Sequence, residues 1–166
     1  MKEKDLQIIG QNALVDIKGH QTQVPAKVDT GADSSSIWAS QIHVSKGGVL
    51  SFVLFDVGSP FYTGEVIERH SYQVAVIRSS NGEEQIRYKI ELPLRVDGKL
   101  IRAQVSLSDR SKNHFPILLG RRTLNKKFVV DVSVQQYEKP KTISRGLRKE
   151  FKKDPHGFHL KYHQSN

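Results

Sequence analysis

The chain has 166 residues and a formal net charge of +9, from 26 Lys and Arg residues against 17 Asp and Glu residues. A domain of this length buries enough apolar surface to fold without cross-links. Cysteine is absent, which excludes disulfides, thiolate catalysis and cysteine-ligated zinc. No apolar run approaches the roughly 18 residues of a membrane helix, and the first residues lack the apolar core of a signal peptide. We therefore expect a cytoplasmic protein that does not contact a membrane.

Short apolar runs separated by turn residues predict β-strands in the first part of the chain. Residues 13–18 and 22–28 flank a tight turn, and residues 49–57 form a buried run. Residues 38–42 are compatible with a single turn of helix.

Two runs near the middle of the chain predict a β-hairpin. Residues 72–78 and 85–96 flank a turn that contains Asn81 and Gly82. Asn-Gly is a strong hairpin signal, because both central residues of a type I′ turn need a positive φ. Pro93 lacks an N–H and predicts an edge or a bulge at that end of the second strand.

The remaining runs complete a β-rich pattern. Asp97 and Gly98 predict another turn, followed by strands over residues 100–107 and 128–134. Residues 120–127 can form two turns of helix. Many short strands with frequent turns predict an all-β barrel or sandwich.

The C-terminal part differs in composition from the rest. Residues 138–166 contain eight Lys and Arg residues against three Asp and Glu residues. Residues 144–153 can form a helix with Leu147 and Phe151 on one face. We divide the chain into a domain over residues 1–137 and a basic C-terminal extension over residues 138–166.

We interpret the extension as solvated. The alternative is a basic arm that binds nucleic acid, the ribosome or an acidic peptide. No RNA-binding motif supports that arm, so nucleic acid is not expected as a partner.

One loop stands out for its chemistry. An apolar strand runs into Asp29, Thr30, Gly31 and Ala32. The strand end would fix the carboxylate of Asp29, the hydroxyl of Thr30 can hydrogen-bond within the turn, and Gly31 permits a backbone that no side chain could accompany. Taken alone, the loop is also compatible with an ordinary Asx turn.

A second segment gives the loop a context. Residues 115–121 form an apolar strand that is closed by Gly120 and Arg121. The two segments, in this order, resemble the retropepsin-like aspartic proteases. The resemblance implies a closed all-β barrel of the retropepsin-like (acid protease) type, with one short helix after the Ile-Leu-Leu-Gly strand. It also implies that Leu119 and Gly120 cross behind the loop.

Further positions follow the same resemblance. Ala32 belongs to the loop, and Asp33 and Arg121 match the two residues that form a buried ion pair in retropepsins. That pair braces the dimer and the site. Residues 27–32 and 107–121 are more specifically similar to a bacterial subfamily labelled ATP-dependent zinc protease. Its members occur beside ATP-grasp ligases that add glutamate to ribosomal protein S6.

The label of that subfamily is not supported by the residues of this chain. It contains no His-Glu-x-x-His motif, and the four His residues before position 138 are isolated in sequence. It also lacks the Gly-rich phosphate loop of ATP-binding proteins. We therefore expect no metal and no cofactor.

The function implied by the resemblance is aspartic endopeptidase activity. The chain contains one Asp-Thr-Gly, so two catalytic carboxylates require a homodimer in which Asp29 of each subunit meets its twin. Thr30 would then reach the partner's backbone. The substrate would be a peptide or protein, and the positive charge suggests an acidic one. The alternative is a catalytically silent retropepsin-like module that acts with a glutamate ligase or a ribosomal partner. A basic nucleic-acid-binding barrel ranks last.

Retropepsins also close a hairpin flap over the substrate. The hairpin centred on Asn81 and Gly82, within residues 72–92, is the first candidate for this flap. The loop over residues 56–64 is the second. An insertion near residues 41–70, relative to compact viral retropepsins, could add a lid or alter dimerisation.

Overall fold

The computed structural model describes residues 6–78, 82–138 and 144–163. Eleven strands and three helices lie in these residues: β1 (Gln7–Ile9), β2 (Asn12–Ile17), β3 (Val24–Val28), β4 (Ser35–Val44), β5 (Leu50–Leu54), β6 (Val66–Arg69), β7 (Gln73–Arg78), β8 (Glu84–Val96), β9 (Lys99–Ser108), β10 (Ile117–Leu119), α1 (Arg121–Leu124), β11 (Phe128–Val130), α2 (Ser144–Lys153) and α3 (Pro155–His163).

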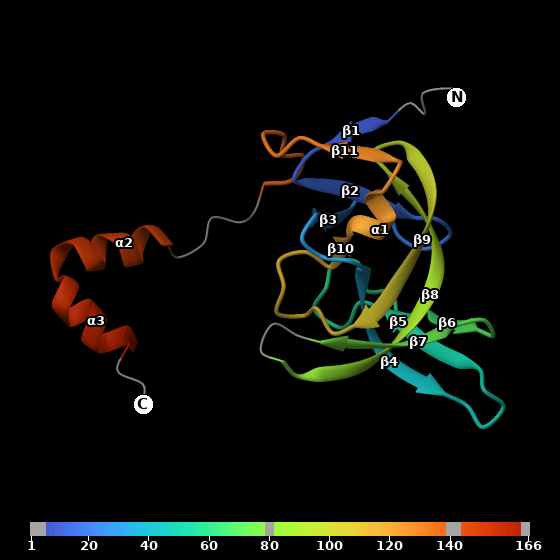
Figure 1. Cartoon of the computed structure of the whole chain (residues 1–166). Coiled ribbons are helices and arrows are strands. Elements are labelled where there is room, and N and C mark those ends of the chain that lie inside the picture. The colour runs from blue at the N-terminus through green and yellow to red at the C-terminus, as the bar shows by residue number, and fades with distance from the viewer. Residues whose placement is uncertain (1–5, 79–81, 139–143, 164–166) are drawn as a thin grey trace.

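Six of the described strands close into a barrel (Figure 1). Their order is β10-β3-β2-β8-β9-β4, and a further pairing between β10 and β4 closes the ring. The short strand β10 pairs in parallel with β3, where Leu119 lies opposite Val28. It pairs antiparallel with β4, where Ile117 lies opposite Ile37. The predicted closed, mostly β barrel is confirmed. Strand β10 closes it, because it pairs with β3 on one side and with β4 on the other.

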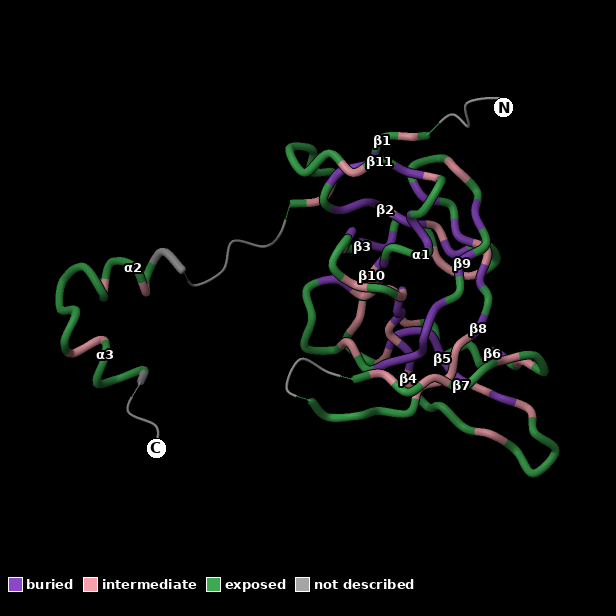
Figure 2. Tube along the Cα trace, viewed as in Figure 1, coloured by how far each residue is buried: buried purple, intermediate pink, exposed green. Residues whose placement is uncertain are grey.

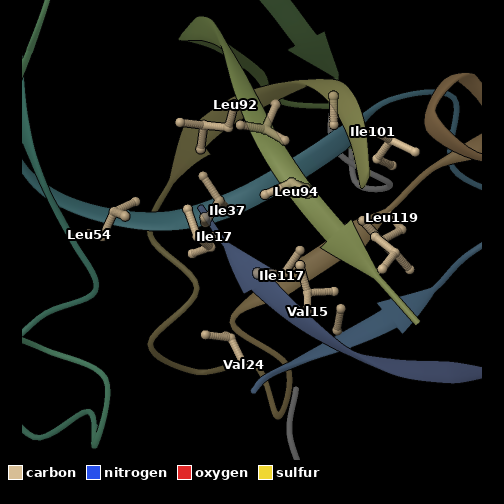
Figure 3. Close-up of a cluster of buried hydrophobic side chains, with 14 of the residues drawn as sticks. Val15, Ile17, Val24, Ile37, Leu54, Leu92, Leu94, Ile101, Ile117 and Leu119 are labelled. Carbon is tan, nitrogen blue, oxygen red and sulfur yellow. The ribbon is translucent and has the colours of Figure 1, made fainter. Parts of the chain in front are cut away.

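The interior of the barrel is filled by branched aliphatic side chains (Figure 3). Val15, Ile37, Leu94 and Leu119 are each fully buried although they come from four different strands. Burial of such a side chain contributes about 1.5–3 kcal/mol. The interior of the barrel is therefore filled by side chains and leaves no room for a ligand. A functional site has to lie on the surface or at the ends of strands.

The insertion near residues 41–70 forms strands rather than a separate lid. Strand β5 pairs antiparallel with β4, and β6 pairs antiparallel with β5. The predicted helical turn over residues 38–42 is wrong, because this segment lies in β4. The predicted strand over residues 49–57 ends at Leu54, and the next residue, Phe55, has a φ of 64°.

The end of the barrel domain also differs from the prediction. Strand β11 ends at Val130, four residues before the predicted strand end, and pairs in parallel with β1. Asp131 ends it by accepting hydrogen bonds from the backbone N–H and the hydroxyl of Ser133. Helix α1 is a single turn over Arg121–Leu124, shorter than the two turns predicted for residues 120–127.

The C-terminal extension contains two helices that stand apart from the barrel in Figure 1. Helix α2 covers the predicted residues 144–153, whereas α3 was not predicted. A signal for α3 exists in the sequence: Asp154 precedes Pro155, and Asp is a preferred N-cap while Pro suits the first helical position. The expectation of one short helix therefore holds for the barrel domain only. No helix in the described part of the chain is long and apolar enough to cross a membrane.

Candidate active site

Asp29 lies at the carboxyl end of β3, beside the end of β10. Its backbone N–H donates to the carbonyl oxygen of Leu119 at 2.9 Å, which continues the parallel pairing of β3 and β10 by one residue. Because the two strands are parallel, the Asp29 loop and Gly120 emerge at the same edge of the sheet. Leu119 and Gly120 therefore lie directly beside the Asp29 loop.

Two donors hold the carboxylate of Asp29. The backbone N–H of Gly31 donates to Oδ1 at 3.0 Å, and Nζ of Lys27 donates to Oδ2 at 3.0 Å. The Lys27 hydrogen bond is the largest of the influences that hold the pKa of Asp29 below its ordinary value. Sequence reasoning did not select Lys27. The available signal was its position two residues before Asp29, which places both side chains on one face of β3.

The loop after Asp29 is tied to the segment after β10. The guanidinium of Arg121 donates to the carbonyl oxygens of Thr30 and Gly31 at 3.2 and 3.0 Å. The backbone N–H of Arg121 donates to the carbonyl oxygen of Ala32 at 2.8 Å. The predicted support residues Ala32 and Arg121 are thus in direct contact, and these bonds restrain the loop that carries Asp29.

Gly120 permits this close approach of two backbones. A Cβ atom at this position would lie 2.5 Å from the carbonyl oxygen of Ser34 and 3.0 Å from that of Ala32. The Gly120 N–H donates to the hydroxyl of Ser35 at 2.9 Å, and that hydroxyl lies 2.6 Å from the hydroxyl of Thr123. Both hydroxyl side chains are buried. This small polar network behind the loop was not predicted.

Asp33 forms the predicted ion pair, but with an additional partner. Its Oδ1 lies 3.7 Å from the guanidinium of Arg121, and its Oδ2 lies 2.9 Å from that of Arg122. The side chains of Asp33 and Arg121 are 56% and 55% exposed. The pair that was expected to be buried is therefore exposed, because none of the elements in the described residues covers it.

A second cation, Arg110, lies near the carboxylate. Arg110 donates to the carbonyl oxygen of Phe115 and the hydroxyl of Ser36, each at 3.0 Å. Burial and the neighbouring Arg87 lower the pKa of Arg110, whereas the charge of Asp29 raises it. Burial also lowers the pKa of Arg87, which lies on β8. Asp29 thus has Lys27 and Arg110 as neighbouring cations, and Arg87 lies near Arg110.

The two flap candidates differ in how they are anchored. Strands β7 and β8 form the predicted hairpin, and Gly82 near its tip has a φ of 87°, with open space where a Cβ atom would lie. Asn81, the other predicted flap residue, lies outside the described residues. In the second candidate, residues 56–64, Phe61 contacts the buried ring of Phe55 at 5.7 Å. Tyr62 also packs against the core. In the hairpin, Tyr72 and Tyr88 likewise pack against the core, near the base of the two strands.

An open pocket of 660 Å³ lies beside the Asp29 loop. Thr30, Asp33 and Arg121 line one side of it, and the segment from Arg122 to Val130 lines the other. Asp29 does not line this pocket, so the pocket is distinct from the space in front of the carboxylate. Among the described residues, no group of three or more His, Cys, Asp or Glu side chains is placed to hold a metal ion.

Comparison with known proteins decides the family. The sequence model of the RimB-like family, described as retropepsin-like aspartic endopeptidase RimB, matches residues 8–141. The chain belongs to this family. The matched region includes the Asp29 loop, β10 and β11, and it ends before α2. The retropepsin-like resemblance and the bacterial subfamily inferred from the sequence are therefore confirmed.

Curated relatives and a solved structure were also found. Two proteins named probable alpha-L-glutamate ligase are similar: one from Desulfotalea psychrophila is 29% identical over 68% of this chain, and one from Shewanella pealeana is 32% identical over 66%. This chain spans only 25% of the length of each. A crystal structure of a Legionella pneumophila protein of unknown function has a TM-score of 0.62 and 24% identity, covering 78% of this chain and 95% of that one. That structure supports the fold alone.

Proposed function

We propose that this RimB-like chain is an aspartic endopeptidase that acts as a homodimer. The observation that carries the proposal is the restrained carboxylate of Asp29, with Oδ1 fixed by the Gly31 N–H at 3.0 Å in an Asp-Thr-Gly loop. Catalytic residues in the proposal are Asp29, Thr30 and Gly31. Ala32, Asp33, Leu119, Gly120 and Arg121 support them.

The chemistry requires two carboxylates. Two acids in close contact cannot both ionise easily, so they share one proton and titrate as a pair. The ionised carboxylate takes a proton from water, which attacks the peptide carbonyl carbon. The protonated carboxylate donates to the carbonyl oxygen, and a proton then passes to the leaving nitrogen as the C–N bond breaks.

Three features support a second copy of the chain as the source of the other carboxylate. The chain has one Asp-Thr-Gly, and the side chain of Asp29 is 25% exposed. Strands β1 and β11 pair only with each other among the described strands, so each has an unpaired edge. Their apolar residues Ile8 and Val129 are 63% and 46% exposed. A partner protomer would cover these groups.

The proposed substrate is an acidic peptide or protein segment. Lys27 and Arg110 supply positive charge near Asp29, Arg87 adds charge beside Arg110, and the whole chain carries a net charge of +9. A carboxylate-rich segment complements this charge. In the proposal, the β7–β8 hairpin closes over the bound segment as the flap.

The alternative is a catalytically silent module that acts with a glutamate ligase or a ribosomal partner. The names of the relatives favour it, because a segment similar to this chain occurs within longer proteins named as probable glutamate ligases. The same fold can host unrelated functions. In this case Asp29 would retain a role in binding without hydrolysis.

A peptide panel with matched variants separates the two functions. The native protein should cleave acidic peptides faster than neutral peptides of equal length. Asp29→Asn should lower turnover by about 10²–10⁴-fold, the usual contribution of acid–base catalysis, without changing the dimer or the unfolding midpoint. Asp97→Asn, in an exposed turn, is the matched control and should retain native activity. Cleavage by Asp29→Asn at the native rate would contradict the peptidase proposal, whereas equal rates on both peptide classes would contradict only the acidic preference.

A further inference from the structure

Helix α2 presents a row of cations to solvent. Arg148, Lys149, Lys152 and Lys153 are all exposed. Arg148 and Lys152 are four residues apart, as are Lys149 and Lys153, so the four side chains form two adjacent rows on one side of the helix. We call these four residues the basic face. Figure 2 shows that most of α2 and α3 is exposed.

The two acidic residues of the helical pair are already engaged within it. Glu150 accepts hydrogen bonds from Nζ of Lys161 at 2.7 Å and from the hydroxyl of Tyr162 at 3.0 Å. Asp154 accepts a hydrogen bond from the backbone N–H of Gly157 at 2.9 Å, at the start of α3. Neither carboxylate is directed to the basic face, so its positive charge is not compensated by the acids of the pair.

Aromatic contacts fix which side of α2 faces outward. The ring of Phe151 packs edge-on against Phe158 at 5.5 Å, and Phe158 contacts Tyr162 at 4.5 Å. These contacts place the Phe151 side of α2 against α3. Phe151 is still 50% exposed at this contact, so the vesicle comparison below separates a lipid surface from nucleic acid.

We propose that the basic face of α2 binds the phosphate backbone of nucleic acid without sequence preference. Charge complementarity favours this occupant, because a row of Lys and Arg on a helix is suited to phosphate contacts. The sequence alone did not lead us to expect nucleic acid, because it contains no RNA-binding motif. Only the structure shows that Glu150 and Asp154 are engaged elsewhere. The extension lies almost entirely beyond the family match, which ends at residue 141, so this activity is independent of the barrel. It would hold the barrel close to proteins that are themselves bound to nucleic acid.

Fluorescence anisotropy with the full chain tests the proposal. The probes are a labelled single-stranded RNA of about 20 nucleotides and a DNA of the same sequence. Four phosphate contacts predict that the logarithm of the binding constant falls against the logarithm of salt concentration with a slope of about −2.8. The variant Arg148→Gln, Lys149→Gln, Lys152→Gln, Lys153→Gln should bind at least about tenfold more weakly and lose most of this slope. Gln is as good a helix former as Lys and Arg, so the helix should remain.

A matched variant separates the effect of the basic face on binding from the effect of the net charge of the chain. Lys18→Gln, Lys46→Gln, Lys112→Gln, Lys126→Gln removes the same number of charges from exposed positions of the barrel domain and should retain native affinity. Equal weakening by both variants would overturn the proposal. So would the absence of salt-dependent binding by the native chain, or stronger binding to phosphatidylserine vesicles than to either probe. The double variant Lys149→Gln, Lys153→Gln should lose about half of the slope, and circular dichroism checks that its helices persist.

Discussion

Lys27 changes the electrostatics expected for a shared pair of carboxylates. Its ammonium lies 3.0 Å from Oδ2 of Asp29, the oxygen that the Gly31 N–H leaves free. A nearby cation favours the ionised form of a carboxyl group. In the proposed dimer, two such cations would stabilise the doubly ionised pair relative to the form that shares one proton. Lys27 would therefore shift activity toward acidic pH without being a catalytic residue.

The variant Lys27→Met tests this role. Removing the ammonium removes the main influence that lowers the pKa of Asp29, so that pKa should rise. Both limbs of the profile of kcat/KM against pH should then move to higher pH, because both protonation steps of the pair involve Asp29. Lys27→Arg keeps the charge and should leave the limbs close to their native positions. An unshifted profile for Lys27→Met would assign Lys27 a purely structural role.

Gly120 is a second position where the addition of a single atom, Cβ, should change stability. The substitution Gly120→Ala would place Cβ 2.5 Å from the carbonyl oxygen of Ser34, a backbone atom that cannot rotate away. We expect the free energy of unfolding of the barrel to fall by about 1–3 kcal/mol, measured by urea denaturation. Gly146→Ala is the control, because nothing lies within 4 Å of its Cβ position in α2. Equal stability of both variants would contradict the close approach.

At the residue scale, the sequence revealed the loop but not its surroundings. Asp29 and Gly120 were found because short motifs encode them directly. Lys27 was not selected. The sequence offers Arg87 and Arg110 only among several Arg residues of which some could line the cleft, because isolated cations are most often solvated. Which of them faces an acid depends on barrel closure, and a single sequence does not encode that visibly.

At the element scale, β10 is the strand on which the site depends. It is three residues long, yet it pairs with β3 on one side and with β4 on the other. The hydroxyl of Ser35 connects β4 to the residues after β10 through the Gly120 N–H and Thr123. The loop position thus depends on a buried hydroxyl in a neighbouring strand.

Ser35→Ala should loosen this connection. Without the hydroxyl, the buried N–H of Gly120 loses its acceptor and Thr123 loses its partner, at a cost of about 1–3 kcal/mol. Urea denaturation measures the effect, and Ser71→Ala, at an exposed position, serves as the control. If the Asp29 loop depends on the network, the folded variant should also cleave peptides more slowly than the folded native protein. Native stability of Ser35→Ala would show that water or a rearrangement replaces the hydroxyl.

The predicted elements succeeded where local chemistry dominates. A turn was predicted over residues 97–99; Asp97 and Gly98 form it, with φ values of 46° and 81°, and Lys99 already begins β9. Pro93 was expected at an edge or a bulge, but β8 continues through it and pairs with Arg102 of β9. On the other side of β8, the pairing with β7 ends at Lys89 and the pairing with β2 begins at Leu94. Pro93 lies between these two pairings, where a missing N–H is tolerated. Long-range pairing, rather than local propensity, decided this position and also made a strand of residues 38–42.

At the scale of the whole molecule, the proposed mechanism needs a second chain to complete the site. Asp29 has a cation and a backbone N–H as partners but lies in a chain with one Asp-Thr-Gly. The ion pairs of Asp33 and the apolar edge of β1 and β11 are exposed. In the proposed homodimer, a twofold partner would cover these groups.

Mixing subunits tests this directly. Native protein and Asp29→Asn are combined in equal amounts and allowed to exchange subunits, and cleavage is compared with that of the same native protein diluted alone. If each active unit needs two Asp29 carboxylates, hybrid dimers are inactive and the rate should fall to about half, because random pairing leaves that fraction of native subunits with native partners. Asp97→Asn replaces Asp29→Asn in the control mixture, which should lose no activity. A rate unchanged by Asp29→Asn, with exchange verified by native mass spectrometry of an isotope-labelled partner, would mean that one chain carries the whole reaction.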